Sequence, residues 1–167
     1  MNKLNSSVNK LDLQIVIASG ICLLAAKWIP EFQIMTACIA TLLCIQDDVK
    51  TSSKASLIRL IITALGGLIG ILVILGDNYF EDPKLFIFLI MAGLFLTLWG
   101  CKLVGIPAFN SRIGGVTFIL VVLTKTGVDR IYYAFFRLLS TLYGVIAVII
   151  VSVIFTFITK LKKISKE

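Results

Sequence analysis

The second half of this 167-residue chain repeats the landmarks of its first half in the same order. Residues 29–32 (Ile-Pro-Glu-Phe) recur as residues 106–109 (Ile-Pro-Ala-Phe), and the pattern Arg-x-x-x-Thr-x-x-Gly at 59–66 recurs at 137–144. The proline precedes the arginine by 29 positions in the first half and by 30 in the second, so the two landmarks keep their register with a slip of one residue. An internal repeat in an apolar chain predicts a membrane fold built from two related halves.

The composition of the chain is that of a membrane protein. Hydrophobic residues make up 59% of it and charged residues 15%, proportions that lie outside the range of soluble domains. Apolar runs fill most of positions 13–158. We therefore expect one transmembrane domain there, preceded by a short cytoplasmic segment (1–12) and followed by a basic cytoplasmic tail (159–167), with no attached enzyme.

Six apolar runs divide positions 13–158. They are residues 13–29, 32–46, 57–75, 85–100, 113–124 and 134–158. The second and fifth runs are short for a membrane span. Whether they cross is therefore judged from the distribution of lysine and arginine on the two sides of the membrane. If both cross, 11 of the 16 lysines and arginines lie on one side, whereas if neither crosses the split is 7 against 9. Because basic residues stay on the cytoplasmic side, six spans with both termini in the cytoplasm are favoured.

Six spans in two repeats give three spans to each half, about 13–76 and 85–158. Residues 15–26 could also be the apolar core of a signal peptide, but they occupy the place of residues 86–100 in the second half, so we expect a permanent helix. An odd number of spans per repeat gives the second half the opposite orientation. We therefore expect an all-α membrane protein with six transmembrane helices in two inverted three-helix repeats, an arrangement found in transporters.

Two arginines in matching positions are the main candidates for a functional site. Arg59 and Arg137 are expected at the start of the third helix of each half, toward opposite membrane faces. Each is followed one turn later by a threonine, Thr63 or Thr141, on the same helical face. A guanidinium and a hydroxyl near a helix N-terminus form a good recognition pair for a carboxylate. Both pairs are therefore expected to line an anion path.

Structural roles compete with this interpretation of the arginines. Arg59 taken alone is more simply explained as a topology residue whose charge extends to the inner surface. Arg137 lies inside an apolar run, where a charge usually faces a cavity or a partner. For Arg137, pairing with Asp129 or Glu31 at the outer interface competes evenly with a functional role.

The two short runs follow the repeated Ile-Pro-x-Phe landmark. Pro30 and Pro107 are expected to end or kink the preceding helices. Matched short segments interrupted by proline point to a binding region near the membrane midplane, where Phe32 and Phe109 would present aromatic faces to a ligand. Alternatively, the two phenylalanines anchor helices at the membrane interface.

Three glycines are expected to serve helix packing. Gly66 and Gly70 form a small-xxx-small pair that lets helix backbones approach closely, and Gly144 occupies the equivalent place in the second half. A phosphate-binding loop would need a preceding strand that this chain lacks.

Metal and redox chemistry have no support in the sequence. The chain contains no histidine, and its four cysteines, at 22, 38, 44 and 101, lie in or next to apolar runs without C-x-x-C spacing. We therefore expect no metal, no cofactor and no catalytic residue. The net charge of +7 is explained by orientation in the membrane, with the C-terminal lysines against anionic lipid, and not by nucleic acid.

Residues 46–54 (Gln-Asp-Asp-Val-Lys-Thr-Ser-Ser-Lys), followed by the Arg-x-x-x-Thr-x-x-Gly-Gly-x-x-Gly pattern at 59–70, resemble the fusaric acid resistance and aromatic acid exporter superfamily. Members share a six-helix unit in which a polar cytoplasmic turn precedes Arg-x-x-Gly-Thr-x-x-Gly. The resemblance implies efflux or conduction of organic anions, such as aromatic carboxylates, across a bacterial inner membrane. It also implies that one unit pairs with a second.

The chain departs from the superfamily pattern at Ile62, where glycine is usual, and at Asp47, where proline is common. No segment corresponding to the cytosolic domain of many members is recognised. Residues and resemblance together predict an inner-membrane homodimer, in contact with lipid, that exports a small organic anion. The alternative is a non-transporting accessory or scaffold subunit that binds a partner protein or anionic lipid.

Overall fold

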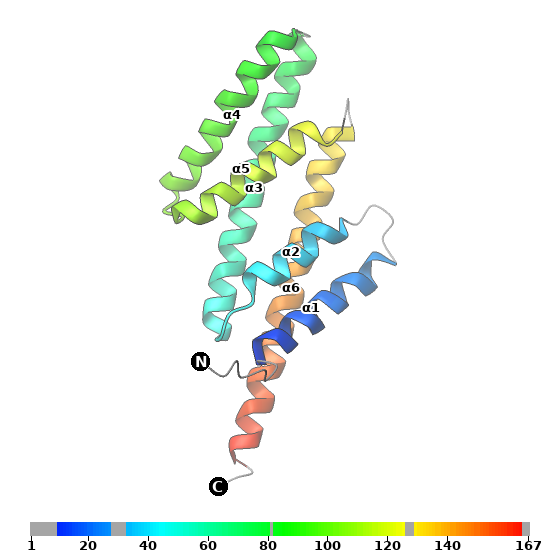
Figure 1. Ribbon diagram of the computed structural model, residues 1–167, viewed down its shortest axis with the longest axis vertical. Helices are drawn as coiled ribbons and strands as arrows, with labels where there is room; N and C mark the ends of the chain where they lie inside the picture. The colour runs from blue at the N-terminus through cyan, green and yellow to red at the C-terminus, as the bar shows by residue number, and fades with distance from the viewer. Residues whose placement is uncertain (1–9, 28–32, 81, 126–128, 165–167) are drawn as a thin grey trace, which may run out of the picture.

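The structure, a computed structural model, describes residues 10–27, 33–80, 82–125 and 129–164 (Figure 1). These residues form helices and short connections. The helices are α1 (Lys10–Ala26), α2 (Ile34–Cys44), α3 (Val49–Phe80), α4 (Pro83–Leu103), α5 (Ala108–Leu123) and α6 (Asp129–Ile164). The expectation of an all-helical protein is thus confirmed for the described residues. Pro30 and Phe32 lie outside them.

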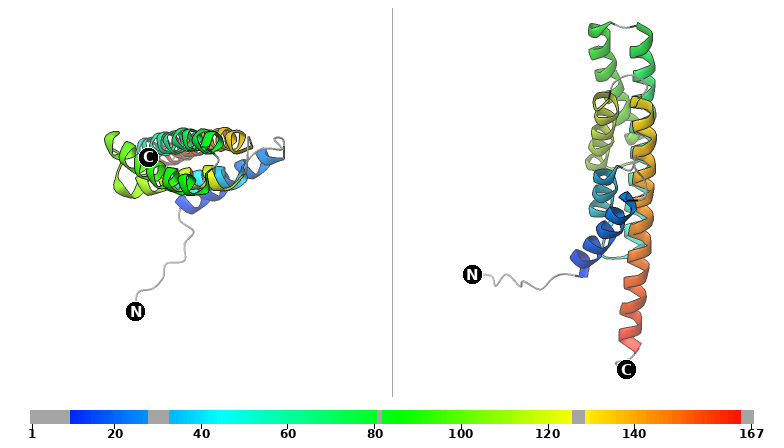
Figure 2. Two further views of the ribbon diagram at one scale, coloured as in Figure 1. Left: turned by 90° about the horizontal axis from the view of Figure 1, so that it is seen from above. Right: turned by 90° about the vertical axis from the view of Figure 1, so that its right-hand side faces the viewer.

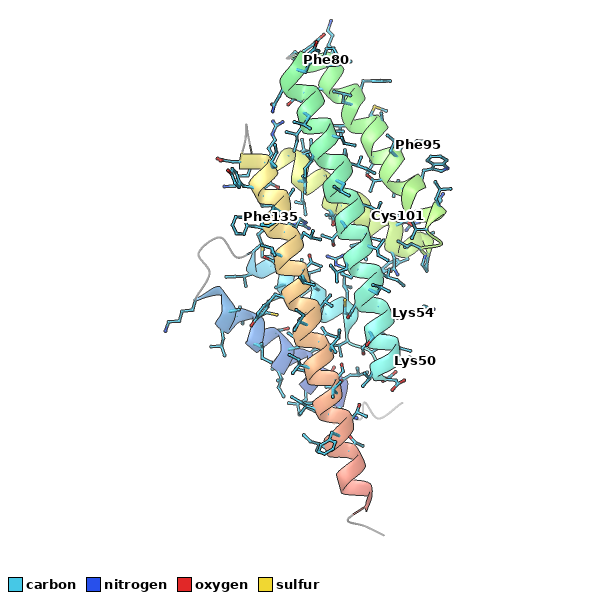
Figure 3. The ribbon with its side chains drawn as sticks, turned by 180° about the vertical axis from the view of Figure 1, so that it is seen from behind. Lys50, Lys54, Phe80, Phe95, Cys101 and Phe135 are labelled. Carbon is cyan, nitrogen blue, oxygen red and sulfur yellow. The ribbon has the colours of Figure 1, made fainter. Side chains whose placement is uncertain are left out.

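The helices form a flat slab of two layers. The two longest helices, α3 and α6, lie side by side in one layer and run in opposite directions, whereas α1, α2, α5 and α4 form the other layer (Figures 1 and 2). The first residues of α3 and the last residues of α6 lie toward the same end of the slab (Figure 1). Lys50 and Lys54 mark this end and Phe80 marks the opposite end (Figure 3).

Local sequence explains where several helices begin and end. Asp48 directly precedes α3, and its carboxylate accepts a hydrogen bond from the N–H of Val49, the first residue of that helix, at 2.9 Å. Asp82 caps α4 by accepting from the Lys84 N–H at 3.0 Å, and Pro83 takes the first turn, where its missing N–H costs nothing. Gly105 ends α4 with a φ of 76°, in the left-handed region that glycine adopts without strain.

Among the described residues, three helices are long and apolar enough to cross a membrane, namely α3, α4 and residues 129–159 of α6. Helix α1 has 17 residues, and the two short runs form helices of 11 (α2) and 16 (α5) residues. Helix α4 extends over 21 residues, beyond both ends of the apolar run 85–100, and helix α6 continues through Ile164 into the segment expected to be a basic tail.

The pattern of contacts between helices is the same in the two halves of the chain: each helix pair in contact has an equivalent pair in which α1, α2 and α3 are replaced by α4, α5 and α6, and the reverse. Helix α3 packs against α4 and α5 of the second half, and α6 packs correspondingly against α1 and α2 of the first half. Helix α4 contacts α5 as α1 contacts α2, helix α5 contacts α6 as α2 contacts α3, and α3 and α6 contact each other. Each long helix is therefore held mainly by the other half of the chain.

Glycines lie where the two halves approach most closely. A Cβ atom on Gly66 would lie 2.7 Å from the backbone oxygen of Gly114 on α5, and one on Gly144 would lie 2.7 Å from the backbone oxygen of Ala37 on α2. The second contact is the repeat equivalent of the first. Gly70 also faces α5, since its Cβ would lie 2.8 Å from Cγ1 of Val121. The α3–α5 and α6–α2 contacts therefore bring backbone against backbone.

Large apolar side chains cover the outside of the slab. Phe95 on α4 is 68% exposed and Phe135 on α6 is 58% exposed (Figure 3). A soluble protein rarely exposes a continuous apolar surface of this kind. Such a surface is instead compatible with lipid.

Candidate functional site

The two repeated arginines lie inside their helices and not at the helix starts. Helix α3 begins at Val49 and α6 at Asp129, so Arg59 follows ten residues, and Arg137 eight residues, after the first residue of its helix. The expectation that they begin the third helices was therefore wrong. The polar segment 49–54, which the resemblance implied to be a turn, is helical, and two of its side chains bond to nearby backbone: the Thr51 hydroxyl donates to the Asp48 carbonyl and the Ser52 hydroxyl to the Gln46 carbonyl.

Both arginines are buried, and their polar atoms are largely unpaired. Arg59 is 4% exposed and Arg137 is 5% exposed. Nε and Nη1 of Arg59, and Nε of Arg137, are buried without a hydrogen-bond partner among the described residues. Nη1 of Arg137 donates to the Tyr133 hydroxyl over 3.4 Å, a long hydrogen bond. Two guanidinium groups thus retain donors that no described protein group uses.

Neither arginine forms an ion pair within the part of the chain that the structure describes. Asp129, one of the two partners expected for Arg137, is not bonded to it, and Glu31, the other, lies outside the described residues. Arg130 provides a contrast, because its Nη1 lies 2.7 Å from Oδ2 of Asp77 and its guanidinium lies 5.5 Å from the Phe86 ring centroid. A buried cation in a protein is normally compensated in this way.

The threonines that follow the arginines bond to the arginine backbone. The Thr63 hydroxyl donates to the carbonyl of Arg59 at 2.9 Å, and the Thr141 hydroxyl donates to the carbonyl of Arg137 at 2.9 Å. A hydroxyl has one proton to donate. The expected pairing of guanidinium and hydroxyl around one anion therefore lacks the hydroxyl proton in this structure.

A small cavity of about 40 Å³ lies beside Arg59. The end of α2 contributes Leu43 and Cys44 to its wall, and the first turns of α5 contribute Asn110 and Ile113. The guanidinium thus lies where one short helix ends and the other begins. The positive end of the α5 dipole favours an anion at this junction, and the negative end of α2 faces the arginine charge.

The surroundings of Arg137 contain more hydrogen bonds. Gln33, at the start of α2, donates from its backbone N–H to the Ser140 hydroxyl at 3.0 Å and from its side-chain amide to the Tyr133 carbonyl at 2.8 Å. The Thr36 hydroxyl donates to Oε1 of Gln33 at 3.2 Å. These bonds tie the start of α2 to the α6 segment that carries Arg137.

Sequence reasoning missed the two amides. Gln33 and Asn110 are equivalent, because each directly follows a repeated Ile-Pro-x-Phe landmark. Each lies at the start of a short helix, near the arginine of the other half's long helix. Extending the landmark by one residue would have identified them.

Each arginine is set well inside its helix, and α3 and α6 run side by side in opposite directions (Figure 3). The expectation that the two arginines lie toward opposite membrane faces stays a prediction.

The remaining predicted site residues that the structure describes, Pro107 and Phe109, do not line the cavity beside Arg59. Pro107 is the N-cap residue of α5, and Phe109 in its first turn is 69% exposed. A second cavity, of about 290 Å³, lies between α3 and α6 and is lined mainly by apolar side chains, with Thr63, Gly67 and Phe135 among them. Within the described ranges, no three His, Cys, Asp or Glu residues are grouped to hold a metal ion.

Apolar helices and a pair of buried, unpaired arginines define an α-helical membrane protein. The chain belongs to the fusaric acid resistance protein-like family, whose model matches residues 21–154. This confirms the resemblance seen in the sequence and places the chain in a family of membrane transporters. No curated protein and no solved structure matches the chain.

Proposed function

We propose that this protein transports organic carboxylate anions, with aromatic acids as the leading class, and that it exports them across the inner membrane of a bacterial cell. The observation that supports this most is the pair of arginines, each at most 5% exposed and neither ion-paired among the described residues. Arg59 and Arg137 provide charged hydrogen-bond donors in a buried region. The family and the apolar surface are consistent with this function.

The energetics of a buried charge support an anionic ligand. A cation removed from water without a partner carries a desolvation penalty of several kcal/mol, and ionisable residues within membrane helices usually mark a substrate or ion pathway. An organic carboxylate beside such a guanidinium would remove this cost while it is bound.

Alternating access is the mechanism we propose, with two inverted repeats that exchange roles. The unchanged contact pattern on exchange of the halves and the antiparallel course of α3 and α6 support this arrangement. The excess of basic residues near Lys50 and Lys54 supports a cytoplasmic position for that end of the slab, with both termini on the same side. We propose that two copies form the working unit.

Flux in proteoliposomes tests the proposal. The purified protein is reconstituted, a proton gradient is imposed, and uptake of labelled benzoate and malate is measured for wild type, Arg59→Gln and Arg137→Gln. Hydrogen bonds to a charged group contribute about 1.5–3 kcal/mol, so each substitution should lower flux by about 10- to 100-fold. Arg112→Gln, which removes the same charge from an exposed position on α5, should retain wild-type flux.

Two results of this assay would contradict the proposal. Wild-type protein that is folded and incorporated but carries no acid would favour the accessory or scaffold role. Flux that survives in both Arg59→Gln and Arg137→Gln would show that the anion path lies elsewhere in the protein.

A further inference from the structure

The surroundings of the two arginines differ in the hydrogen bonding of the equivalent amide side chains, Gln33 near Arg137 and Asn110 near Arg59. Gln33 uses its side-chain amide as a donor to the Tyr133 carbonyl at 2.8 Å and as an acceptor from Thr36 at 3.2 Å. Its equivalent, Asn110, lines the cavity beside Arg59, and its side chain makes no hydrogen bond to another described residue. The Arg59 cavity therefore has free donors from two side chains.

The size of this cavity limits what can enter it. It offers about 40 Å³ to water-sized atoms, and one such atom needs about 10–15 Å³. The cavity therefore has room for about three or four non-hydrogen atoms, which is the size of one head group such as a carboxylate. Because the cavity is open on one side, the body of an aromatic or aliphatic acid would extend out of it.

Three features of the wall favour a negative charge. Arg59 is 4% exposed, and its Nε and Nη1 are buried without partners. Asn110 adds an amide donor from the first turn of α5. The N-cap residue of α5, Pro107, makes no side-chain hydrogen bond to the helix start, so the N–H groups of that turn remain available.

We propose that this cavity is the head-group site for the transported anion, and that Arg59 and Asn110 donate hydrogen bonds to its carboxylate. The inference rests on the anion transport proposed above and adds the residues that bind the head group. The site contacts the carboxylate, and the rest of the acid extends out of the cavity. Benzoate and phenylacetate should therefore bind with similar affinity.

Asn110→Asp tests the site by supplying an anion from the protein itself. The new carboxylate would pair with Arg59 and fill the cavity, so benzoate flux should fall by about 10-fold or more while the protein remains folded. Asn110→Leu, which keeps the size of the side chain but removes the donor, should raise the KM for benzoate. The matched control is Asn78→Asp, an exposed position near the far end of α3; it adds the same charge and should retain wild-type flux.

Competition tests whether the head group is what the site recognises. Phenylacetate is added to the transport assay with labelled benzoate, and binding of benzoate is measured separately from the shift in Tm of the detergent-solubilised protein. Phenylacetate should compete as well as unlabelled benzoate, because it presents the same carboxylate to Arg59 and Asn110.

The outcomes separate this inference from the transport function. Flux that is unchanged in Asn110→Asp, or a failure of phenylacetate to compete with benzoate, would overturn the head-group site and leave transport standing. A Tm shift with benzoate that disappears in Asn110→Asp, in a protein that carries no acid, would support the site and overturn transport. Absence of both flux and binding in the folded wild-type protein would overturn both.

Discussion

Two adjacent glycines of α3 offer a direct test of the packing described here. A Cβ atom added to Gly66 would lie 2.7 Å from the Gly114 carbonyl oxygen, 3.2 Å from the Phe118 nitrogen and 3.3 Å from the Thr117 Cβ. The nearest of these is roughly 0.7 Å closer than ordinary van der Waals contact at 3.4 Å, and it belongs to backbone that cannot rotate away. Gly67, the next residue, has no atom within 4 Å of such a Cβ.

The expected magnitude follows from two opposing effects. Replacing glycine with alanine inside a helix stabilises the helix by up to about 1 kcal/mol, and this gain is common to both positions. Forcing an extra methyl into close-packed surroundings costs about 1–3 kcal/mol, and this cost applies only at Gly66. The Gly66→Ala protein should therefore be about 1–3 kcal/mol less stable than the Gly67→Ala protein.

The assay is reversible unfolding in mixed micelles, followed by circular dichroism and tryptophan fluorescence, with the two variants compared side by side. Gly144→Ala is the equivalent test of the second half and should behave like Gly66→Ala, because its Cβ would lie 2.7 Å from the Ala37 carbonyl oxygen. Equal stabilities of Gly66→Ala and Gly67→Ala would refute the close approach of α3 to α5.

Three further predictions concern other contacts. The Asp77–Arg130 ion pair is partly buried, with side chains 22% and 14% exposed, so a double-mutant cycle with Asp77→Asn and Arg130→Gln should give a coupling energy of about 1–3 kcal/mol; a value near zero would contradict this contact between α3 and α6. Thr63→Val and Thr141→Val should leave benzoate flux near the wild-type level, because each hydroxyl donates to its own backbone; a large loss would place these hydroxyls in the anion path. In a background with the four native cysteines replaced by serine, Lys50→Cys should be labelled only from the cytoplasmic side and Phe80→Cys only from the outer side, since the two lie at opposite ends of α3 (Figure 3); labelling of both from one side would contradict a membrane-spanning α3.

The repeat carried most of what could be predicted from sequence. Landmarks at 29–32 and 59–66 located both short helices and both arginines, because proline and a charged residue within an apolar run have few structural roles. Helix ends were predicted less well. The resemblance implied a polar turn after Asp48, but that segment is helical, with serine and threonine side chains that bond back to the backbone.

The composition of the arginine sites could not be predicted in the same way. Asn110 and Arg59 are 51 positions apart in sequence, and they come together only because α3 packs against α5 of the other half. Likewise, the hydrogen bonds of Gln33 to Tyr133 and Ser140 depend on the contact between α2 and α6. Periodicity within one helix contains no information on which helix of the other half it meets.

The central claim is that a carboxylate binds a buried guanidinium in the membrane. Detecting that contact by solid-state NMR is the measurement that tests the claim most directly. The protein is labelled with ¹⁵N-arginine, reconstituted in bilayers with benzoate carrying ¹³C at its carboxyl carbon, and examined by solid-state NMR for ¹³C–¹⁵N dipolar coupling. We predict coupling to guanidinium nitrogens in wild type that is lost in Arg59→Gln and retained in Arg112→Gln. Saturating benzoate that shows no coupling to any arginine in the wild-type protein would contradict the account.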